Sequence, residues 1–398
     1  MKAPVLRVGE PIMLYRSFRS FVPILVVASA LQACAGNTVV LVRPSAAPTA
    51  TPAPGQTATP TPAATATPTP GATATPTHAP TATPTPATTP TPTATPAQTV
   101  YWDLFDGSNN FPLEFAGLPL TASSSDTQIN ATAGNKLRCT AGMTSDSMHR
   151  LWILSYPNGC SGPFSAIVLV FTPPITQSST PVLTFNLPGT GDDDLMTFDS
   201  LGNLWVEDNF NSKVQEFTGP FVTSGSLSAA VTLTNGINKP SGIAVGSTGN
   251  VYVSNVTSTG TNSITVFQAP VTASTTPTFL NGLKGPGGLI FDSAGNLYAS
   301  NNSNSGTTWS IDRYNSNNLG SGATPNIVDS AGLPSGDYEA SFAFDAAGNL
   351  YDADCGSNPG IRVYPTATMA FSSSLAPSVI YTNSSITSIG CAWGIAVP

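Results

Sequence analysis

Residues 291–298 read Phe291-Asp292-Ser293-Ala294-Gly295-Asn296-Leu297-Tyr298, and the same pattern occurs three more times in the chain. The other copies are Phe198–Trp205, Val245–Tyr252 and Phe344–Tyr351, and the four glycines follow one another at spacings of 47, 46 and 53 residues. A degenerate copy, Met143–Trp152, aligns with Met196–Trp205 and has His149 in place of the glycine. Each copy predicts a β-hairpin, because a short apolar strand ends before a Gly-Asn turn and a Leu-aromatic strand follows.

Two more apolar segments follow each hairpin and predict a third and a fourth strand. The third strands are expected at 166–171, 213–217, 263–267, 309–314 and 360–364. The fourth strands are expected at 182–186, 230–234, 277–281, 325–329 and 378–382. Four antiparallel strands in a repeat of about 46–53 residues are typical of the blades of a β-propeller.

The two ends of this region supply a sixth blade. Trp393-Gly394-Ile395-Ala396-Val397 resembles the first strand Ser241-Gly242-Ile243-Ala244-Val245, and the chain stops where a turn is due. Val100–Trp102, Phe111–Gly117 and Gln128–Thr132 fit the second, third and fourth strands. Pairing the ends would remove two exposed sheet edges. The sequence therefore predicts an all-β, six-bladed propeller over residues 100–398 whose termini close one blade.

Residues 1–36 are predicted to be an export signal. Arg16 and Arg19 precede the apolar run Phe21–Leu31, which is too short for a membrane-spanning helix of roughly 20 residues. Leu31-Gln32-Ala33-Cys34 resembles a bacterial lipobox, in which Cys34 would carry the lipid. Ordinary cleavage after Ala33-Cys34-Ala35 is the alternative and would release a secreted protein.

Residues 37–99 form a predicted disordered linker. From about Pro44 the segment consists of Thr-Pro-Ala repeats, with His78 as its only ionisable side chain. Such a composition buries too little apolar surface to offset the entropy of ordering, and the prolines favour extended polyproline II. We expect a stalk between the membrane-side segment and the propeller, and its threonines are candidates for O-glycosylation.

The repeat motifs resemble those of a known superfamily. Pro240–Val245 and Pro286–Asp292 are similar to NHL-repeat propellers and to the wider superfamily of gluconolactonase-type enzymes and virginiamycin B lyase-type proteins. The resemblance covers nearly all of residues 100–398 and implies the architecture. It does not imply one activity, because that superfamily contains lyases, lactonases and binding modules.

One acidic cluster is a candidate metal site. Asp193 and Glu339 occupy equivalent positions in blades two and five at the expected mouth of the channel, and these blades lie opposite each other in a ring of six. Asp194 adds to the cluster, and Asp192 and Asp337 lie nearby in the sequence. Gluconolactonase-type enzymes hold a divalent cation at this place, and carboxylate oxygens suit calcium. The competing interpretation is a set of solvated acidic loop residues.

The remaining chemistry-bearing residues have structural interpretations. The aspartates of the repeats, Asp146, Asp199, Asp292 and Asp345, precede tight turns and are expected to accept backbone N–H bonds there. The aromatic series Trp152, Trp205, Tyr252, Tyr298 and Tyr351 is expected to fill space between blades. His149 lies in a turn, so a histidine-dependent lyase mechanism is disfavoured.

Four cysteines remain after Cys34, which suggests two disulfides in an exported domain. Cys139 and Cys391 are expected where the chain enters the first strands of blades one and six, and Cys160 and Cys355 in loops between second and third strands on the same rim. These places favour Cys139–Cys160 and Cys355–Cys391, and the other two pairings stay open.

Composition points to a protein outside the cytoplasm and away from nucleic acid. Only 9% of the residues are charged and the net charge is −8, whereas a nucleic-acid-binding surface needs several cations. We expect a monomer that works as a non-enzymatic binding module for an unknown protein, glycan or small molecule. An exported lyase or lactonase with a cation at the channel mouth is the alternative.

Overall fold

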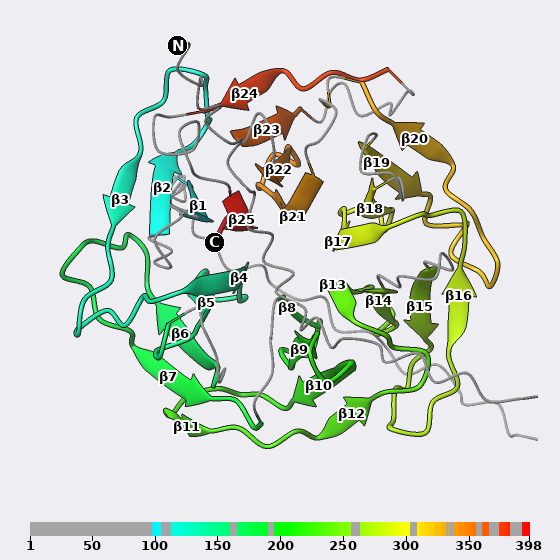
Figure 1. Cartoon of the computed structure of the whole chain (residues 1–398), viewed down its shortest axis with the longest axis horizontal. Coiled ribbons are helices and arrows are strands. Elements are labelled where there is room, and N and C mark those ends of the chain that lie inside the picture. Colours follow the sequence, from blue (N-terminus) through cyan, green and yellow to red (C-terminus); the bar gives the residue numbers. More distant parts are fainter. Residues whose placement is uncertain are drawn as a thin grey trace, which may run out of the picture. The chain divides into compact units, whose positions relative to one another are not determined.

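The computed structural model describes residues 98–104, 113–159, 165–189, 195–255, 263–302, 309–331, 333, 338–355, 360–365, 374–382 and 392–398. They form six β-sheets arranged as blades around a central axis (Figure 1). The predicted six-bladed propeller is therefore confirmed. No helix long and apolar enough to cross a membrane is found among these residues.

Each blade runs from an inner strand at the axis to an outer strand at the circumference (Figure 1). Blade one contains β4 (Thr140–Ser145), β5 (Leu151–Ser155), β6 (Ile167–Phe171) and β7 (Leu183–Asn186). Blade two contains β8 (Met196–Phe198), β9 (Leu204–Asp208), β10 (Lys213–Phe217) and β12 (Val231–Leu233). Blade three contains β13 (Pro240–Val245), β14 (Val251–Asn255), β15 (Ser263–Phe267) and β16 (Thr278–Leu280). Blade four contains β17 (Pro286–Phe291), β18 (Leu297–Asn302), β19 (Trp309–Tyr314) and β20 (Ile327–Asp329). Blade five contains β21 (Tyr338–Phe344), β22 (Leu350–Cys355), β23 (Gly360–Tyr364) and β24 (Val379–Tyr381).

Blade six is built from both ends of the domain, as predicted. Its strands are β25 (Ala392–Ala396), β1 (Thr99–Leu104), β2 (Leu113–Gly117) and β3 (Thr127–Ile129). In the antiparallel β1–β25 pair, Tyr101 lies opposite Ala396 and Trp102 lies opposite Ile395. The backbone N–H of Gly394 also donates to the buried carboxylate of Asp103. The closing contact thus combines strand pairing with a charge-assisted hydrogen bond.

The turns between first and second strands define one face of the disc, here called the hairpin rim. Its turns are Asp146–Arg150, Asp199–Asn203, Gly246–Asn250, Asp292–Asn296 and Asp345–Asn349. Asp199 Oδ1 accepts the N–H groups of Leu201 and Asn203 at 2.9 Å each, and Gly202 has φ +82°. His149 takes φ +57° in the degenerate turn. The predicted turn roles of the aspartates and of His149 are confirmed.

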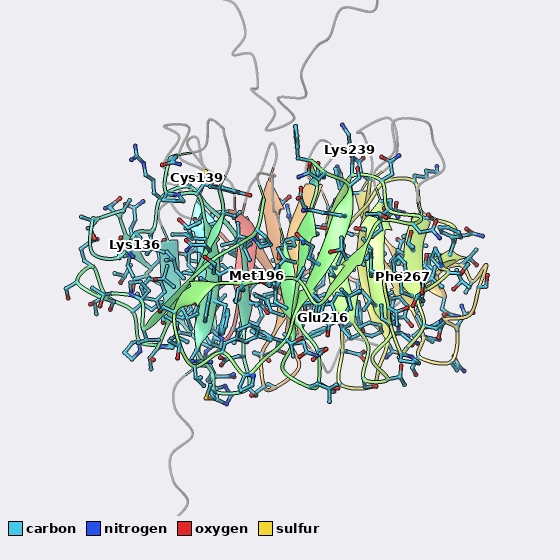
Figure 2. All side chains as sticks on the ribbon, turned by 90° about the horizontal axis from the view of Figure 1, so that it is seen from below. Lys136, Cys139, Met196, Glu216, Lys239 and Phe267 are labelled. Atoms are coloured by element: carbon cyan, nitrogen blue, oxygen red, sulfur yellow. The ribbon has the colours of Figure 1, made fainter. Side chains whose placement is uncertain are left out.

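The opposite face, where the chain enters the inner strands, is here called the loop rim. Cys139 and Lys239 lie there, as the edge-on view in Figure 2 shows. Residue 98, the first described residue, lies instead at the hairpin rim, because Gln98 Oε1 accepts the N–H of Ala346 in the blade-five turn at 3.2 Å.

Outer strands are capped by the following blade, which the sequence did not predict. A short additional strand from blade two, β11 (Gly225–Ser226), pairs in parallel with β7 and makes the first sheet five-stranded. Ala323 of blade four covers the edge of blade three beside β16, because its carbonyl oxygen accepts the N–H of Asn281 at 2.7 Å. Gln177 does the same for blade six, since its amide exchanges hydrogen bonds with the backbone of Asn130 at 3.0 and 2.9 Å. These contacts satisfy backbone groups that an open edge would expose.

Aromatic rings fill the seams between blades, as predicted. Trp152 of blade one packs edge-on against Phe198 of blade two, with ring centroids 4.9 Å apart. Tyr252 packs against Phe291 in the same manner between blades three and four. Tyr298 does so against Phe344 between blades four and five. The repeat aspartates also bind these rings, because Asp146 Oδ2 accepts Trp152 Nε1–H at 2.8 Å and Asp345 Oδ2 accepts the Tyr351 hydroxyl at 3.0 Å. One carboxylate therefore fixes both a turn and a seam.

Gly242 lies directly against the inner strand of the next blade. A Cβ at this position would overlap the carbonyl oxygen of Gly287 in blade four and lie 2.7 Å from Ser254 Oγ. We expect Gly242→Ala to destabilise the fold by about 1–3 kcal/mol, because the backbone must shift to admit the methyl group. Chemical denaturation would measure this loss. Gly117→Ala is the matched control, since a Cβ there meets nothing within 4 Å, and equal losses in both variants would contradict the steric argument.

Candidate functional site

The inner strands place their side chains in layers along the channel. The residues opposite the seam aromatics form one layer: Thr144, Thr197, Ala244, Ile290, Ala343 and Ala396. The preceding layer, toward the loop rim, is bulky and apolar and at most 8% exposed: Met143, Met196, Ile243, Leu289, Phe342 and Ile395. The following layer, toward the hairpin rim, is half-buried: Ser145, Phe198, Val245, Phe291, Phe344 and Val397.

A cavity of about 210 Å³ lies among these layers. All six inner strands or the residues beside them contribute to its wall, which includes Leu195, Ile243, Gly288, Ile395 and Val397. The lining side chains that belong to the described residues are neutral: the set consists of aliphatic, aromatic, methionine, glycine and hydroxyl residues.

Hydroxyl and apolar side chains both line the cavity. Blades one and two contribute the hydroxyls of Thr144, Ser145 and Thr197 together with the apolar side chains of Met143, Leu195 and Met196. Blades four and five, across the ring in Figure 1, contribute Leu289, Ile290, Phe291 and Phe342–Phe344, with Ser341 as the one hydroxyl on that side. Ser145 Oγ donates to Val397 O at 3.4 Å. Within the described residues, the hydroxyls of Thr144 and Thr197 make no hydrogen bond, so they are available to a ligand.

A recurring polar side chain near the end of the second strand supports the loop rim. Ser155 Oγ donates to Arg138 O at 2.8 Å, Asn255 Oδ1 accepts the N–H of Asn238 at 2.8 Å, and Asn301 Oδ1 accepts that of Lys284 at 2.8 Å. Each bond holds the segment that leads into an inner strand. The repeat alignment could have revealed this position, because short polar residues recur there, but the hydrogen-bond partners are distant in sequence.

The predicted metal site is only partly within the described residues. Asp192, Asp193, Asp194 and Asp337 lie outside them. The backbone of Glu339 is in β21, where it pairs with Asp354 of β22 at the loop-rim end. Among the described residues there is no cluster of three acidic, histidine or cysteine side chains able to hold a metal. The proposed ligation by Asp193, Asp194 and Glu339 stays a prediction.

Of the cysteines, Cys139 is described with its side chain. It is fully buried beside β4, has φ +48° and is disulfide-bonded. Cys34, Cys160 and Cys391 lie outside the described residues, so the pairings Cys139–Cys160 and Cys355–Cys391 remain predictions. The structure places Cys355 at the end of β22, whereas we expected it in the following loop.

Hydrogen bonds set the charge of the aspartate in the degenerate turn. Burial raises the pKa of Asp146, but hydrogen bonds from the Arg150 backbone, Trp152 Nε1 and the Arg150 side chain, together with the Arg150 charge, lower it overall. Arg150 Nε lies 2.6 Å from Asp146 Oδ2. This carboxylate is therefore held ionised by structural partners, which agrees with a role in the turn.

Buried charges that the sequence did not predict lie in the seams of blades four and five. Asp312 is fully buried and accepts a hydrogen bond from Asn301 Nδ2 at 2.8 Å, and burial raises its pKa to about 6. Asp352 and Asp354 are fully buried, and Arg362 forms an ion pair with Asp354. None of these residues lines the channel cavity.

Comparison with known proteins shows likeness of fold only. No family model matches the sequence, and no curated protein matches it. A streptogramin B lyase is 14% identical with a TM-score of 0.34, over 57% of this chain and 66% of the lyase, just under two thirds of its length. Virginiamycin B lyase from Staphylococcus aureus is 13% identical with a TM-score of 0.39, over 64% and 77% of the two chains. A candidate 6-phosphogluconolactonase from Bacteroides uniformis is 11% identical with a TM-score of 0.47, over 69% and 80%.

The six-bladed β-propeller seen in the six sheets is similar in fold to these two lyases and to the candidate 6-phosphogluconolactonase. At these identities the likeness extends to the fold and not to an activity.

Proposed function

We propose that the protein is an exported, non-enzymatic binding module that takes a small neutral ligand group into the channel of its propeller. The observation that supports this function is the cavity of about 210 Å³, which, within the described part of the chain, is lined by neutral hydroxyl and apolar side chains.

The segments before the propeller give this module its proposed setting. Residues 1–36 would direct export, with lipid attachment at Cys34 or simple cleavage, and residues 37–99 would form a stalk. We further propose the disulfides Cys139–Cys160 and Cys355–Cys391, which would fasten the loop rim.

Filling the channel tests the proposed function. The full chain is screened against a mixed set of single-ring and short-chain compounds of neutral, cationic and anionic type by thermal shift and ligand-observed NMR. We expect some compounds to stabilise the natural protein and to lose this effect in Ile290→Phe, because the larger side chain occupies the cavity. Ile380→Phe is the matched control, since Ile380 is 45% exposed on an outer strand.

The outcome that contradicts a channel-binding module is a screen in which no compound distinguishes Ile290→Phe from the natural protein. The alternative function, an exported lyase or lactonase with calcium at Asp193, Asp194 and Glu339, is tested separately by calorimetry. Heat of calcium binding that disappears in Glu339→Gln would favour that enzyme over a pure binding module.

A further inference from the structure

The hairpin rim of blades one and two carries three strongly exposed apolar side chains. Leu201 is 84% exposed, Val222 is 75% exposed and Met148 is 62% exposed, and the three together are here called the apolar patch. We infer that the apolar patch docks a protein partner through a segment that combines an apolar side chain with a lysine or arginine. This inference concerns a different face from the channel and goes beyond the proposed function.

Val222 and Met148 belong to loops that meet at one buried ring. Phe221 of blade two packs against Trp152 of blade one with ring centroids 5.3 Å apart, which brings the neighbouring Val222 to the seam between these blades. The turn that contains Met148 is fixed to the same ring, because Asp146 Oδ2 accepts Trp152 Nε1–H at 2.8 Å. The two exposed side chains therefore flank one seam.

Leu201 lies in a turn that contacts the loop of Val222. Asn203 Oδ1 accepts the N–H of Gly219, at the start of that loop, at 3.2 Å. The turn is itself held by Asp199 Oδ1, which accepts the N–H of Leu201 at 2.9 Å. Ordered loops lose little freedom on binding, and neighbouring exposed apolar side chains usually mark a site of interaction.

Carboxylates beside the apolar patch determine the charge of the partner. Burial raises the pKa of Glu216 on β10, and the charge of Asp199 raises it further, so these two acids lie close together. Among the described residues, which include every hairpin-rim loop of blades one to three, neither acid has a cation as a partner. In blade one, Arg150 is already paired with Asp146 at 2.6 Å. A cation placed beside Leu201 would offset the repulsion between the two acids.

Other occupants match this surface less well. A second copy of the chain docked face to face would bring another Asp199 and Glu216 to the contact. Residues 44–97 of the chain contain no lysine or arginine. A membrane of anionic lipids would repel the same carboxylates. A basic and apolar protein segment complements both the exposed carbon and the charge.

Selection from a library of random short peptides displayed on phage tests the inference without assuming a sequence. The library is selected on the full chain and counter-selected on the double variant Leu201→Ser, Val222→Ser, whose changes lie at the surface. We expect the peptides that distinguish the two proteins to combine large apolar residues with lysine or arginine.

A synthetic copy of a selected peptide then measures the contributions of single residues. We expect Leu201→Ser to weaken its binding about tenfold or more, because the apolar contact is lost. Glu216→Gln should weaken it about threefold and reduce its dependence on salt. Val328→Ser, at a 48% exposed position on β20, and Asp126→Asn in blade six are the matched controls and should leave the affinity unchanged.

Four outcomes would overturn the inference, and none of them bears on the channel. Discriminating peptides that are neutral or acidic would exclude the basic partner, and a selection that yields no discriminating peptide would exclude the docking surface. Self-association in analytical ultracentrifugation that Leu201→Ser abolishes would assign the apolar patch to a second copy. Flotation with phosphatidylcholine–phosphatidylglycerol vesicles that the same variant abolishes would assign it to a membrane.

Discussion

Removal of residues 392–398 is expected to abolish cooperative folding of the propeller. These residues include β25 (Ala392–Ala396), the inner strand of blade six, and their loss leaves β1 with an unpaired edge at the channel. Ile395 is 1% exposed and packs in a cluster with Trp102, Ala343 and Tyr351, whereas Ala396 packs in a second cluster with Tyr101 and Met143. One strand therefore joins blade six to blades five and one, and without it both seams open.

Graded variants of Ile395 test the same strand without deleting it. Ile395→Val should cost about 0.5–1.5 kcal/mol and Ile395→Ala about 2–5 kcal/mol, as for other buried aliphatic side chains. Far-UV circular dichroism and chemical denaturation report both. A synthetic peptide of residues 392–398 should restore cooperative unfolding to the truncated chain. A truncated protein that unfolds as cooperatively as the full one would contradict closure by the termini.

The sequence revealed the architecture because the same local physics recurs in every blade. A Gly-Asn turn after an apolar strand can be recognised from neighbouring residues alone, and the regular spacing of these turns gives the number of blades. The fit of Trp393–Val397 to Ser241–Val245 also predicted the closing strand, which β25 confirms. What repetition predicts best is therefore the inner hairpin and its turn.

Features that break the repeat, or that depend on contacts between blades, were predicted less well. Gly225 and Ser226 of β11 have no apolar pattern that would predict a strand. They form one because they pair with the edge of β7. The threonines of the channel align with Ala244 and Ala396, yet alternation alone does not say which layer borders the cavity. The candidate metal residues were inferred from a relative's pattern, and the described residues do not test them.

The buried carboxylates of β22 could have been predicted from the repeat, because one of them replaces a residue that is apolar in other blades. Asp352 stands where Val206, Val253 and Ala299 stand in blades two to four. An aspartate at an otherwise apolar position is a departure that alignment exposes. Its partner Arg362 lies opposite on β23, but that pairing becomes visible only with the register.

Loss of the Asp354 carboxylate is expected to be among the most damaging single changes in the protein. Arg362 is 1% exposed and forms an ion pair with Asp354, which is itself fully buried. Alternation along β22 and β23 places this pair on the face of Leu350 and Tyr364, which packs against Tyr298 and Ile311 of blade four. Asp354→Ala would leave the Arg362 charge in an apolar seam with less compensation.

Breaking a buried pair in this way typically costs about 3–5 kcal/mol. Chemical denaturation at neutral pH measures the loss, and Asp126→Ala is a control in a half-buried loop of blade six, for which we expect less than about 1 kcal/mol. A loss for Asp354→Ala no larger than that of the control would show that the seam admits water and that the ion pair contributes little.

Asp352 should behave in the opposite sense, because it is the second acid beside a single arginine. Burial raises the pKa of Asp352 well above its usual range; the Arg362 charge lowers it, and the Asp354 charge raises it further. A carboxyl whose folded-state pKa exceeds its unfolded value binds its proton more tightly in the folded protein. Stability is therefore full below the unfolded pKa of about 3.9 and declines as pH rises through the folded pKa.

Asp352→Asn removes this titration and keeps the shape of the side chain. We expect the variant to be more stable than the natural protein at neutral pH and to lose the part of the pH dependence that Asp352 causes, whereas at pH 4 the two should be similar. Asp312, whose pKa burial raises to about 6, adds a decline of the same sign that Asp312→Asn would remove. Denaturation curves between pH 4 and 8 decide the matter: a destabilised Asp352→Asn variant at neutral pH would mean that Arg362 depends on both carboxylates and that Asp352 is ionised in the folded seam.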